Sequence, residues 1–360
     1  MSYDKQIISD IAELKSTMRS LGLYERPAGR VVLCWLYNLA LILGGLAVFV
    51  FSDALWLRIP AIVLSTLGLL GNATIAHSAS HGSISDSSAL NTFLFYFGFP
   101  FMLMVSAKYW NRSHIRVHHP APNVIGVDDD SDLSPFFALN ERDVAGAGPA
   151  RRWFFRYQGY LIPFLIVFNG FNVQRTGWTL LVRELFDPGK RTASHWADLA
   201  AMFAHVLVWI GLPMLFFPMI DVLLVYVLRI VLMGYAMFAA FAAAHFPAEA
   251  ICIDPDQREN FDFYFRQTIA TINFRTGFFG RLACNGVEYQ IEHHIFPNIS
   301  HIHYPRLSPL MRDFCARHGM PYRTLGWGEA IWKSYLVFFR PKPVLSDLES
   351  MRLAPAGSGA

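Results

Sequence analysis

The residues best suited to chemistry are histidines that gather in three short clusters. The chain of 360 residues has 13 histidines. Seven of them lie in the clusters: His77, His81, His114, His118, His119, His293 and His294. Imidazole nitrogen binds iron, zinc and copper well, and no cysteine stands near the clusters to favour a thiolate site. The clusters therefore predict a metal site that is held mainly by histidine.

The spacing within the clusters indicates how the side chains would point. His77 and His81 are four residues apart, which stacks both imidazoles on one face of a helix. His114 and His118 repeat that spacing. The third cluster is an adjacent pair, and neighbouring residues point about 100° apart around a helix axis. Such a pair can serve two metal ions, or one metal together with another segment.

The composition indicates a membrane protein. Hydrophobic residues make up 54% of the chain and charged residues only 16%, and the mean hydropathy is +0.32. These values are not those of an ordinary soluble protein. The net charge of +3 and the lack of a basic, aromatic-interleaved motif argue against a nucleic-acid partner.

Four apolar runs are long enough to cross a bilayer core of about 30 Å. They cover residues 31–51, 54–76, 198–219 and 220–244. We therefore predict an all-α integral membrane protein with a single domain over residues 1–353. Residues 77–197 and 245–353 would form a helical, histidine-rich cap, and residues 354–360 a disordered tail.

Shorter apolar runs and the basic residues set the expected topology. Residues 91–105 are too few to span comfortably, and a span there would separate the first two clusters, so we expect a re-entrant or interfacial segment. Residues 157–171 have arginine and aromatic flanks that are typical of interfacial anchors, and residues 1–30 suit an interfacial or cytosolic helix. Lys and Arg concentrate on the histidine side, which predicts that both termini and the histidine clusters are cytoplasmic.

Two polar residues fall inside the predicted spans. Arg229 lies mid-span, where a charge costs roughly 2.5–3.5 kcal/mol on the insertion scale. His205 lies at a comparable depth on the preceding span. We expect either a polar contact between the two or an Arg229 side chain that extends to the far surface.

Three histidine clusters on one face of a four-span protein resemble the membrane fatty acid desaturase family. The resemblance runs from about His77 to Tyr322. The third cluster stands in Gln290-Ile291-Glu292-His293-His294-Ile295-Phe296-Pro297, where a Gln in place of a first His is similar to the front-end and acyl-CoA branch. The chain departs from many relatives beside the clusters, at Ser78, Ile115 and Glu288. These departures concern the outcome of the oxidation more than the metal site.

The resemblance implies a centre of two non-haem iron ions held mostly by histidine. It adds His245, at the end of the last span, to the seven clustered histidines, although an interfacial histidine among lipid headgroups would explain that residue as well. Gln290 is placed at the catalytic site, either as a weak ligand through its carbonyl oxygen or as a holder of bound water. Structural zinc is the alternative for the clusters as a whole.

Several acidic residues are candidates to orient the imidazoles. Ligand histidines usually donate their second N–H to a carboxylate, a carbonyl or water. Asp128, Asp129, Asp130 and Glu292 are plausible acceptors, and His303 is a further candidate for such a supporting role. For the aspartate run, a solvated loop is an equal interpretation.

The leading function implied by the resemblance is O2-dependent desaturation of a fatty acyl chain within the lipid bilayer. The sequence contains no His-Pro-Gly-Gly haem motif and no iron–sulfur cysteine spacing, so a separate ferredoxin or cytochrome b5 would supply electrons. A hydroxylase or related oxidase on the same centre is the nearest alternative. A membrane metal transporter or receptor is a remote one, because it would need ligands at mid-membrane.

Overall fold

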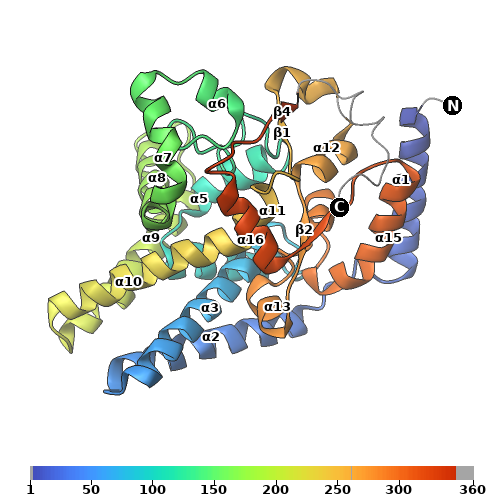
Figure 1. Cartoon of the computed structure of the whole chain (residues 1–360). Coiled ribbons are helices and arrows are strands. Elements are labelled where there is room, and N and C mark those ends of the chain that lie inside the picture. The colour runs from blue at the N-terminus through green and yellow to red at the C-terminus, as the bar shows by residue number, and fades with distance from the viewer. Residues whose placement is uncertain (1–2, 261, 346–360) are drawn as a thin grey trace.

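The computed structural model describes residues 3–260 and 262–345, and these residues form a helical structure with very little sheet (Figure 1). The predicted all-α membrane class is confirmed. The predicted tail at 354–360, and both ends of the predicted 1–353 domain, lie outside the described residues.

Four helices are long and apolar enough to cross a membrane, as predicted. The first two are α2 (Ala28–Phe51) and α3 (Leu55–Ser80). The third joins α9 (Ala193–Val206) to the short turns η3 (Leu207–Gly211) and η4 (Pro213–Leu215). The fourth joins α10 (Met219–Met237), η5 (Phe238–Ala242) and α11 (Ala243–His245). The last span therefore includes His245 as its final residue.

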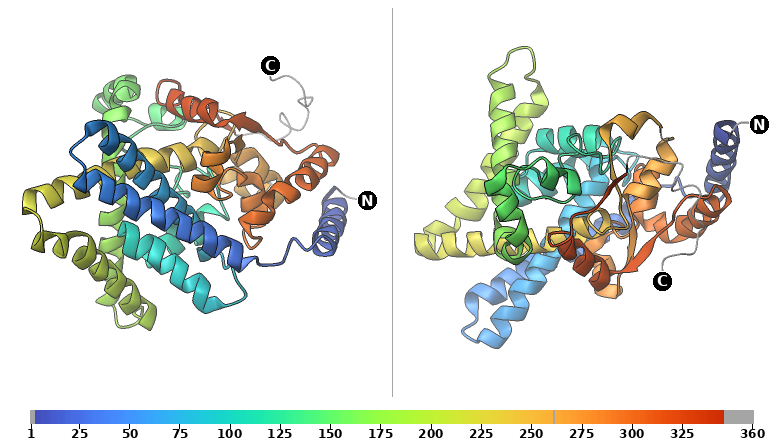
Figure 2. Two further views of the ribbon diagram at one scale, coloured as in Figure 1. Left: turned by 90° about the horizontal axis from the view of Figure 1, so that it is seen from below. Right: turned by 45° about the horizontal axis from the view of Figure 1, so that its top comes forward.

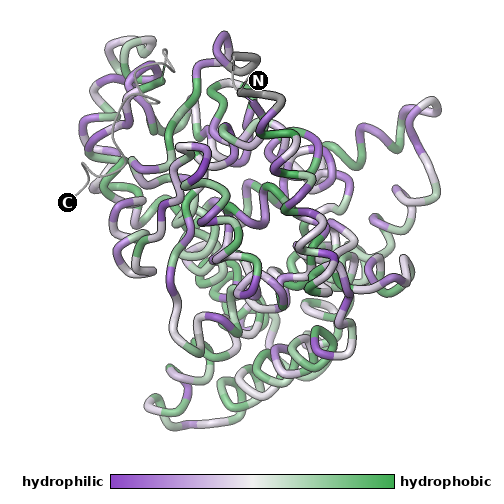
Figure 3. Tube along the Cα trace, turned by 90° about the vertical axis from the view of Figure 1, so that its right-hand side faces the viewer, coloured by the Kyte–Doolittle hydropathy of each residue, from purple (hydrophilic) through white to green (hydrophobic). Residues whose placement is uncertain are grey.

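The spans form two hairpins whose far ends project from the rest of the protein (Figures 1 and 2). Large apolar side chains at these ends are exposed, including Phe51, Trp56, Leu215 and Phe216. Figure 3 shows hydrophobic residues concentrated along the lower helices. Exposed apolar surface of this extent is what a lipid-facing surface requires.

The run at residues 91–105 does not span. It forms α4 (Ser88–Tyr96) and the π-helical η1 (Phe97–Phe101), which pack against α3. Gly98 permits the close approach, because a Cβ atom there would lie 2.3 Å from the Cβ of Ala76. The chain then enters α5 (Ala107–Trp110) and the π-helical η2 (Asn111–His118), which carries the second histidine cluster.

The run at residues 157–171 crosses a helical bend. The short α6 (Glu141–Ala145) precedes it. The run begins within α7 (Pro149–Leu165) and ends within α8 (Val167–Leu185). Trp153, Tyr160 and Phe164 are exposed on α7. The arrangement suits the interfacial position expected of this segment.

The C-terminal part of the cap is built from short elements. Its helices are η6 (Pro255–Asn260), α12 (Phe263–Ala270), α13 (Phe278–Cys284), α14 (Gln290–Ile295), η7 (His301–His303), α15 (Tyr304–Arg317) and α16 (Trp327–Leu336). Parallel pairing joins β1 (Cys252–Ile253) to β4 (Val344–Leu345), and β2 (Asn273–Arg275) to β3 (Thr324–Gly326). The N-terminal helix α1 (Tyr3–Ser20) packs its apolar face against α15, so the N-terminal helix belongs to the cap.

The two polar residues inside the spans take separate partners. His205 Nε2 lies 2.8 Å from the Tyr226 hydroxyl, and its Nδ1 lies 2.7 Å from the Phe101 carbonyl oxygen. The Arg229 guanidinium stacks on the Trp209 ring, 4.1 Å from the centroid. The expected contact between Arg229 and His205 is therefore wrong, and so is extension to the far surface, because Arg229 is only 8% exposed. The aromatic face compensates the cation locally.

Candidate metal centre

Eight histidines from four separate segments converge where the spans meet the cap. His77 lies in the last turn of α3, and His81 ends that helix. His245 ends the fourth span. His114, His118 and His119 come from η2 and the residue after it, while His293 and His294 come from α14. Seven of the eight side chains are buried, and His81 is half-buried.

The ligand nitrogens fall into two groups, and within each group they lie within 4.8 Å of one another. The five-histidine group contains His77, His81, His114, His119 and His293. The three-histidine group contains His118, His245 and His294. All eight sequence-predicted metal ligands are thus brought together at two adjacent positions.

A π-helix decides which residues of the second cluster share a group. The backbone N–H of His119 donates to the carbonyl of His114, five residues earlier, at 3.0 Å. This wider turn brings the Nε2 atoms of His114 and His119 within 3.2 Å. The rings of His114 and His118 stack, as their spacing predicts, yet the two residues belong to different groups.

The adjacent histidine pairs divide between the two groups. The ring planes of His118 and His119 are inclined by 83° to each other, and those of His293 and His294 by 88°. In each pair one residue joins the five-histidine group and the other joins the three-histidine group. An adjacent pair could serve two metal ions, or one metal together with another segment. The structure has the first arrangement, because each pair contributes to both groups.

Two aspartates orient imidazoles. Both carboxylate oxygens of Asp128 lie 2.9 Å from His118 Nδ1, and Asp130 lies 2.8 Å from His114 Nδ1. Each contact leaves the Nε2 atom of the ring free to face a metal position. Burial would raise the pKa of Asp128, but the neighbouring His118 outweighs burial and the pKa lies below its ordinary value.

Three predicted supporting residues lie elsewhere. Asp129 is exposed, and no hydrogen bond joins it to a histidine within residues 3–260 and 262–345. Glu292 is fully buried but accepts hydrogen bonds from Asn273, at 2.8 Å, and from the Tyr322 hydroxyl. His303 faces the carbonyl of Glu25 at 3.0 Å. These expectations are corrected: the contacts of Glu292 and His303 fasten α14 and η7 to the surrounding cap.

Two supporting residues were missed from the sequence. The side-chain oxygen of Gln267, on α12, lies 3.0 Å from His294 Nδ1, and its amide donates to the His119 carbonyl at 2.8 Å. The Tyr304 hydroxyl lies 3.2 Å from His293 Nδ1. Gln267 had no detectable signal, because it follows no motif. Tyr304 follows the third cluster in the sequence and lies within the part of the chain that resembles the family.

The donor set fits metal ions. Buried nitrogen atoms of His81 (Nε2), His119 (Nδ1), His245 (Nδ1) and His294 (Nε2) have no hydrogen-bond partner in the part of the chain that the structure describes. The same is true of the carbonyl oxygen of Gln290, at the start of α14. Buried polar atoms without partners are costly, so these atoms indicate missing ligands such as metal ions.

The electrostatics keep most of the imidazoles neutral and able to bind metal. His118 is the exception, because the Asp128 carboxylate outweighs burial and raises its pKa. Burial lowers the pKa of His81 to about 3. Burial also lowers the pKa of His119, His293 and His294 well below the ordinary value, and the neighbouring histidines lower it further. A neutral imidazole offers a lone pair, and this chemistry suits iron, zinc or copper.

Comparison with known proteins points to one family. The family model described as fatty acid desaturase matches residues 53–326. A Delta(8)-fatty-acid desaturase of Borago officinalis is 23% identical over 340 residues, covering 90% of this chain and 73% of that protein. Fatty acid desaturase 3 of Homo sapiens is 28% identical over 262 residues (69% and 54%). An sn-1 linoleoyl-lipid 6-desaturase of Arthrospira platensis is 25% identical over 290 residues (75% and 74%).

Proposed function

Because the chain belongs to the fatty acid desaturase family, we propose that it introduces a double bond into a fatty acyl chain, using two non-haem iron ions and an external electron donor. As a member of the family it is an oxidoreductase of the membrane that acts on fatty acyl substrates. The observation that carries the proposal is the convergence of eight histidines in adjacent groups of five and three.

The two histidine groups would each hold one iron ion. The five-histidine group offers more ligands than a structural zinc site, which is usually closed by four, and this excess favours iron. Gln290 would face the ions as a weak ligand or hold a water molecule there. Bound iron would supply the activation of dioxygen that an unactivated methylene group requires.

The overall reaction balances with an outside reductant. Two neighbouring C–H bonds of the substrate break, and a C=C bond forms between their carbon atoms. Dioxygen is reduced to two water molecules by four electrons, two from the broken bonds and two from the donor. Two of the four protons come from the substrate and two from solvent. The donor is proposed to be a separate protein of the ferredoxin or cytochrome b5 type.

The chain's own residues position the reaction and keep it dry. Asp128 and Asp130 fix the ring orientation of His118 and His114. Gln267 does the same for His294 and also holds the backbone of His119. The burial of the site excludes water, which protects a reactive centre from side reactions. The substrate must therefore reach the metals through a defined opening in the cap.

The names of the relatives support a proposal for the position of the new double bond on the acyl chain. The named relatives include Delta(8), Delta(5) and 6-desaturases, and we propose that this chain also acts near the carboxyl end of its substrate, as a front-end desaturase.

The histidine groups lie at the ends of the spans that join the cap. We place the cap and both termini on the cytoplasmic side, because that side is rich in Lys and Arg.

A hydroxylase is the second candidate because the two reactions need the same ligands. Ser78 and Ile115 stand beside His77 and His114, so they bear on how the substrate carbon sits after the first C–H bond breaks. A transporter is disfavoured, because the histidine groups lie at the span ends and not at mid-membrane.

The test is acyl profiling of cells that express the chain beside cells that express His293→Ala. We expect a product two mass units lighter than its substrate, made only by the active chain, and about two irons per chain in protein purified without chelators. A product that gains one oxygen, labelled from heavy-isotope dioxygen, would assign the chain to the hydroxylases. An unchanged acyl profile with the active chain would reject both reactions.

A further inference from the structure

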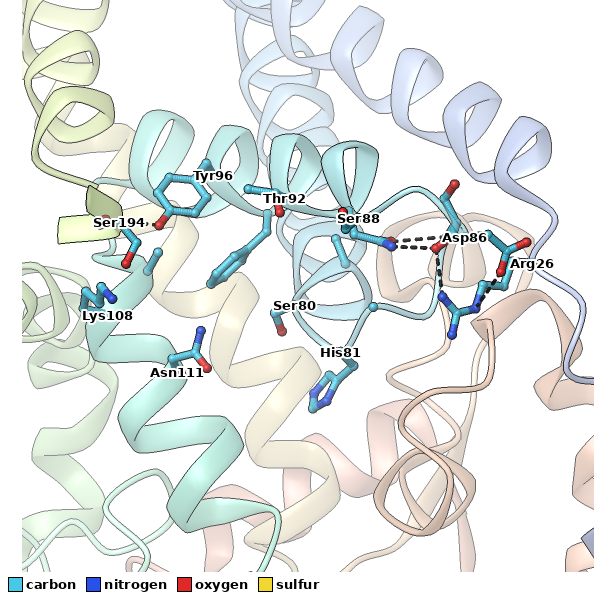
Figure 4. A pocket seen from close by; sticks show the side chains of 16 residues that line it. Arg26, Ser80, His81, Asp86, Ser88, Thr92, Tyr96, Lys108, Asn111 and Ser194 are labelled. Atoms are coloured by element: carbon cyan, nitrogen blue, oxygen red, sulfur yellow. Dashed lines mark hydrogen bonds and ion pairs between the residues drawn. The ribbon is translucent and has the colours of Figure 1, made fainter. Parts of the chain in front are cut away.

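A cavity of about 570 Å³ opens beside the proposed metal centre, and a ligand of that centre forms part of its wall. Figure 4 shows His81 at the base of the cavity, with Lys108 and Ser194 on one side and Arg26 and Asp86 on the other. His81 belongs to the five-histidine group, and its Nε2 atom is buried without a partner in the described residues. A molecule in this cavity therefore lies directly against the metal site.

The cavity lies at the membrane end of the cap. Its wall includes the end of α3, the outer helix α4, and the start of α9, and Arg26 lies just before α2. Three of the four spans thus begin or end at this cavity. Lipid headgroups lie at this depth of a membrane protein, whereas a soluble carrier would approach from the aqueous side.

Uncommitted polar groups line the cavity. The side chains of Ser88, Thr92 and Asn111 form no hydrogen bond with other residues among those the structure describes. The Ser80 hydroxyl donates to the His77 carbonyl at 2.7 Å, and the Tyr96 hydroxyl donates to the Ser194 carbonyl at 3.3 Å. The free hydroxyls and the free amide offer both donors and acceptors, which is the pattern that a hydroxyl-bearing ligand needs.

The charge in the cavity is small. Arg26 is held by Asp86, at 3.6 Å, and by the Ser85 carbonyl, at 2.9 Å. Lys108 is the cavity cation that has no ion-pair partner in the described part of the chain. The next basic residue along η2, Arg112, pairs with Glu184 at 3.9 Å. Phosphates are bound through charge-assisted contacts with Arg and Lys, and coenzyme A carries several, so this lining does not match it.

We propose that the cavity binds the headgroup of an intact glycerolipid whose headgroup is uncharged and carries hydroxyls, such as a hexose. The inference rests on the proposed function. A double bond near the carboxyl end requires the ester to lie close to the metals, and the contact of the cavity with His81 provides that proximity. The acyl chain would enter the site past His81 while the headgroup stays at the membrane surface.

The test is binding of three probes with the same acyl chain to the iron-loaded full chain in detergent: a galactosyl diacylglycerol, phosphatidylglycerol and linoleoyl-CoA. We expect the galactolipid to bind most tightly. Asn111→Leu should weaken its binding by up to about tenfold, because neutral hydrogen bonds are lost. Lys108→Gln removes the charge but keeps a hydrogen-bond donor, so it should change galactolipid binding little. Thr92→Val provides a second cavity variant at an exposed position, and Thr179→Val, exposed on α8, is its matched control.

Three results would contradict, in turn, the uncharged headgroup, the cavity as the binding place, and the proposed function. Tighter binding of linoleoyl-CoA or phosphatidylglycerol, lost in Lys108→Gln, would overturn the uncharged headgroup. Unchanged galactolipid binding in both cavity variants, with normal iron content, would overturn the cavity as the binding place. Failure to desaturate any carrier while the expected binding order holds would contradict the proposed function alone, so the two ideas fail separately.

Discussion

Asp128 presents both of its carboxylate oxygens to one nitrogen of His118, each at 2.9 Å. The same carboxylate accepts the backbone N–H of Asn123 at 2.8 Å. Asp128 is fully buried, so its charge acts on His118 with little screening. The pair fixes the one histidine of the second cluster that faces the three-histidine group.

Asp128→Asn should therefore weaken metal binding without unfolding the loop. An asparagine oxygen still accepts the Asn123 N–H, but the charge that favours a donating His118 Nδ1 is lost. Loss of such an outer partner typically costs 10–100-fold in metal affinity or activity. Iron content and turnover measure the effect, and Asp129→Asn is the matched control because Asp129 is exposed. Equal losses in both variants would contradict the role given to Asp128.

His245→Gln should remove metal from the three-histidine group while sparing the five-histidine group. His245 is one of only three imidazoles there, so the remaining two would hold an ion poorly. We expect the iron content to fall from about two toward about one per chain, with loss of activity. His195→Gln is the control, because His195 is buried but contacts Glu184 at 3.0 Å and not the centre. Full iron in His245→Gln would remove His245 from the ligand set.

Gln267→Leu should reduce metal affinity although Gln267 does not belong to any histidine cluster. The substitution removes the oxygen that accepts from His294 Nδ1 and the amide that holds the His119 carbonyl. Gln267→Glu restores an acceptor for His294 but not the amide donor, so it should retain more metal than the leucine variant. Metal titration of both variants, with melting temperature as a check on folding, makes the comparison. An identical affinity of the two variants would show that the contact to His294 does not matter.

Glu288→Gln should stabilise the protein at alkaline pH. Burial raises the pKa of Glu288 to about 7 from an ordinary value of 4.5. The folded state thus binds more protons than the unfolded state between those values, so stability falls as pH rises through this window. The raised pKa corresponds to about 3 kcal/mol of lost stability once Glu288 is ionised, and the glutamine variant would recover it above pH 7. Thermal unfolding from pH 5 to 9 measures it; parallel curves for both proteins would contradict the prediction.

Cysteine labelling of intact cells tests the proposed sidedness. Cys34 is half-buried and the other three cysteines are buried, so background labelling should be low. Phe217→Cys, in the turn between η4 and α10, should react with an impermeant reagent from outside. Asp129→Cys, on the cap, should react only after the membrane is opened. Strong external labelling at position 129 would contradict the cytoplasmic location of the cap.

The spans and the metal ligands were predictable because their signals are local. A bilayer imposes a length on apolar runs, and imidazole clusters stand out in composition, so four spans and eight histidines could be located from spacing and resemblance. The contact of Gln267 could not, since it joins residues 148 positions apart through packing of α12. The cavity around His81 was also beyond prediction, because its wall comes from five separate segments.

The predicted supporting residues show the same limit. Asp128 and Asp130 lie near their histidines in sequence, and the structure places them against imidazoles. Glu292 is next to His293, yet the helix turns its carboxylate toward Asn273. Proximity in sequence does not fix the direction of a side chain when the helix rotates neighbours by about 100°.

The π-helix at Asn111–His118 also determines how this segment responds to a change in its length. A π-turn holds one residue more than the α-turn that it replaces. Deleting one residue between His114 and His118 would let the turn close as an ordinary α-turn and leave the residues on either side in place, so His119 would stay on the face of His114. An inserted residue has no such outlet, and it would rotate the side chains that follow it by about 100°. The segment should therefore tolerate the loss of one residue far better than the gain of one.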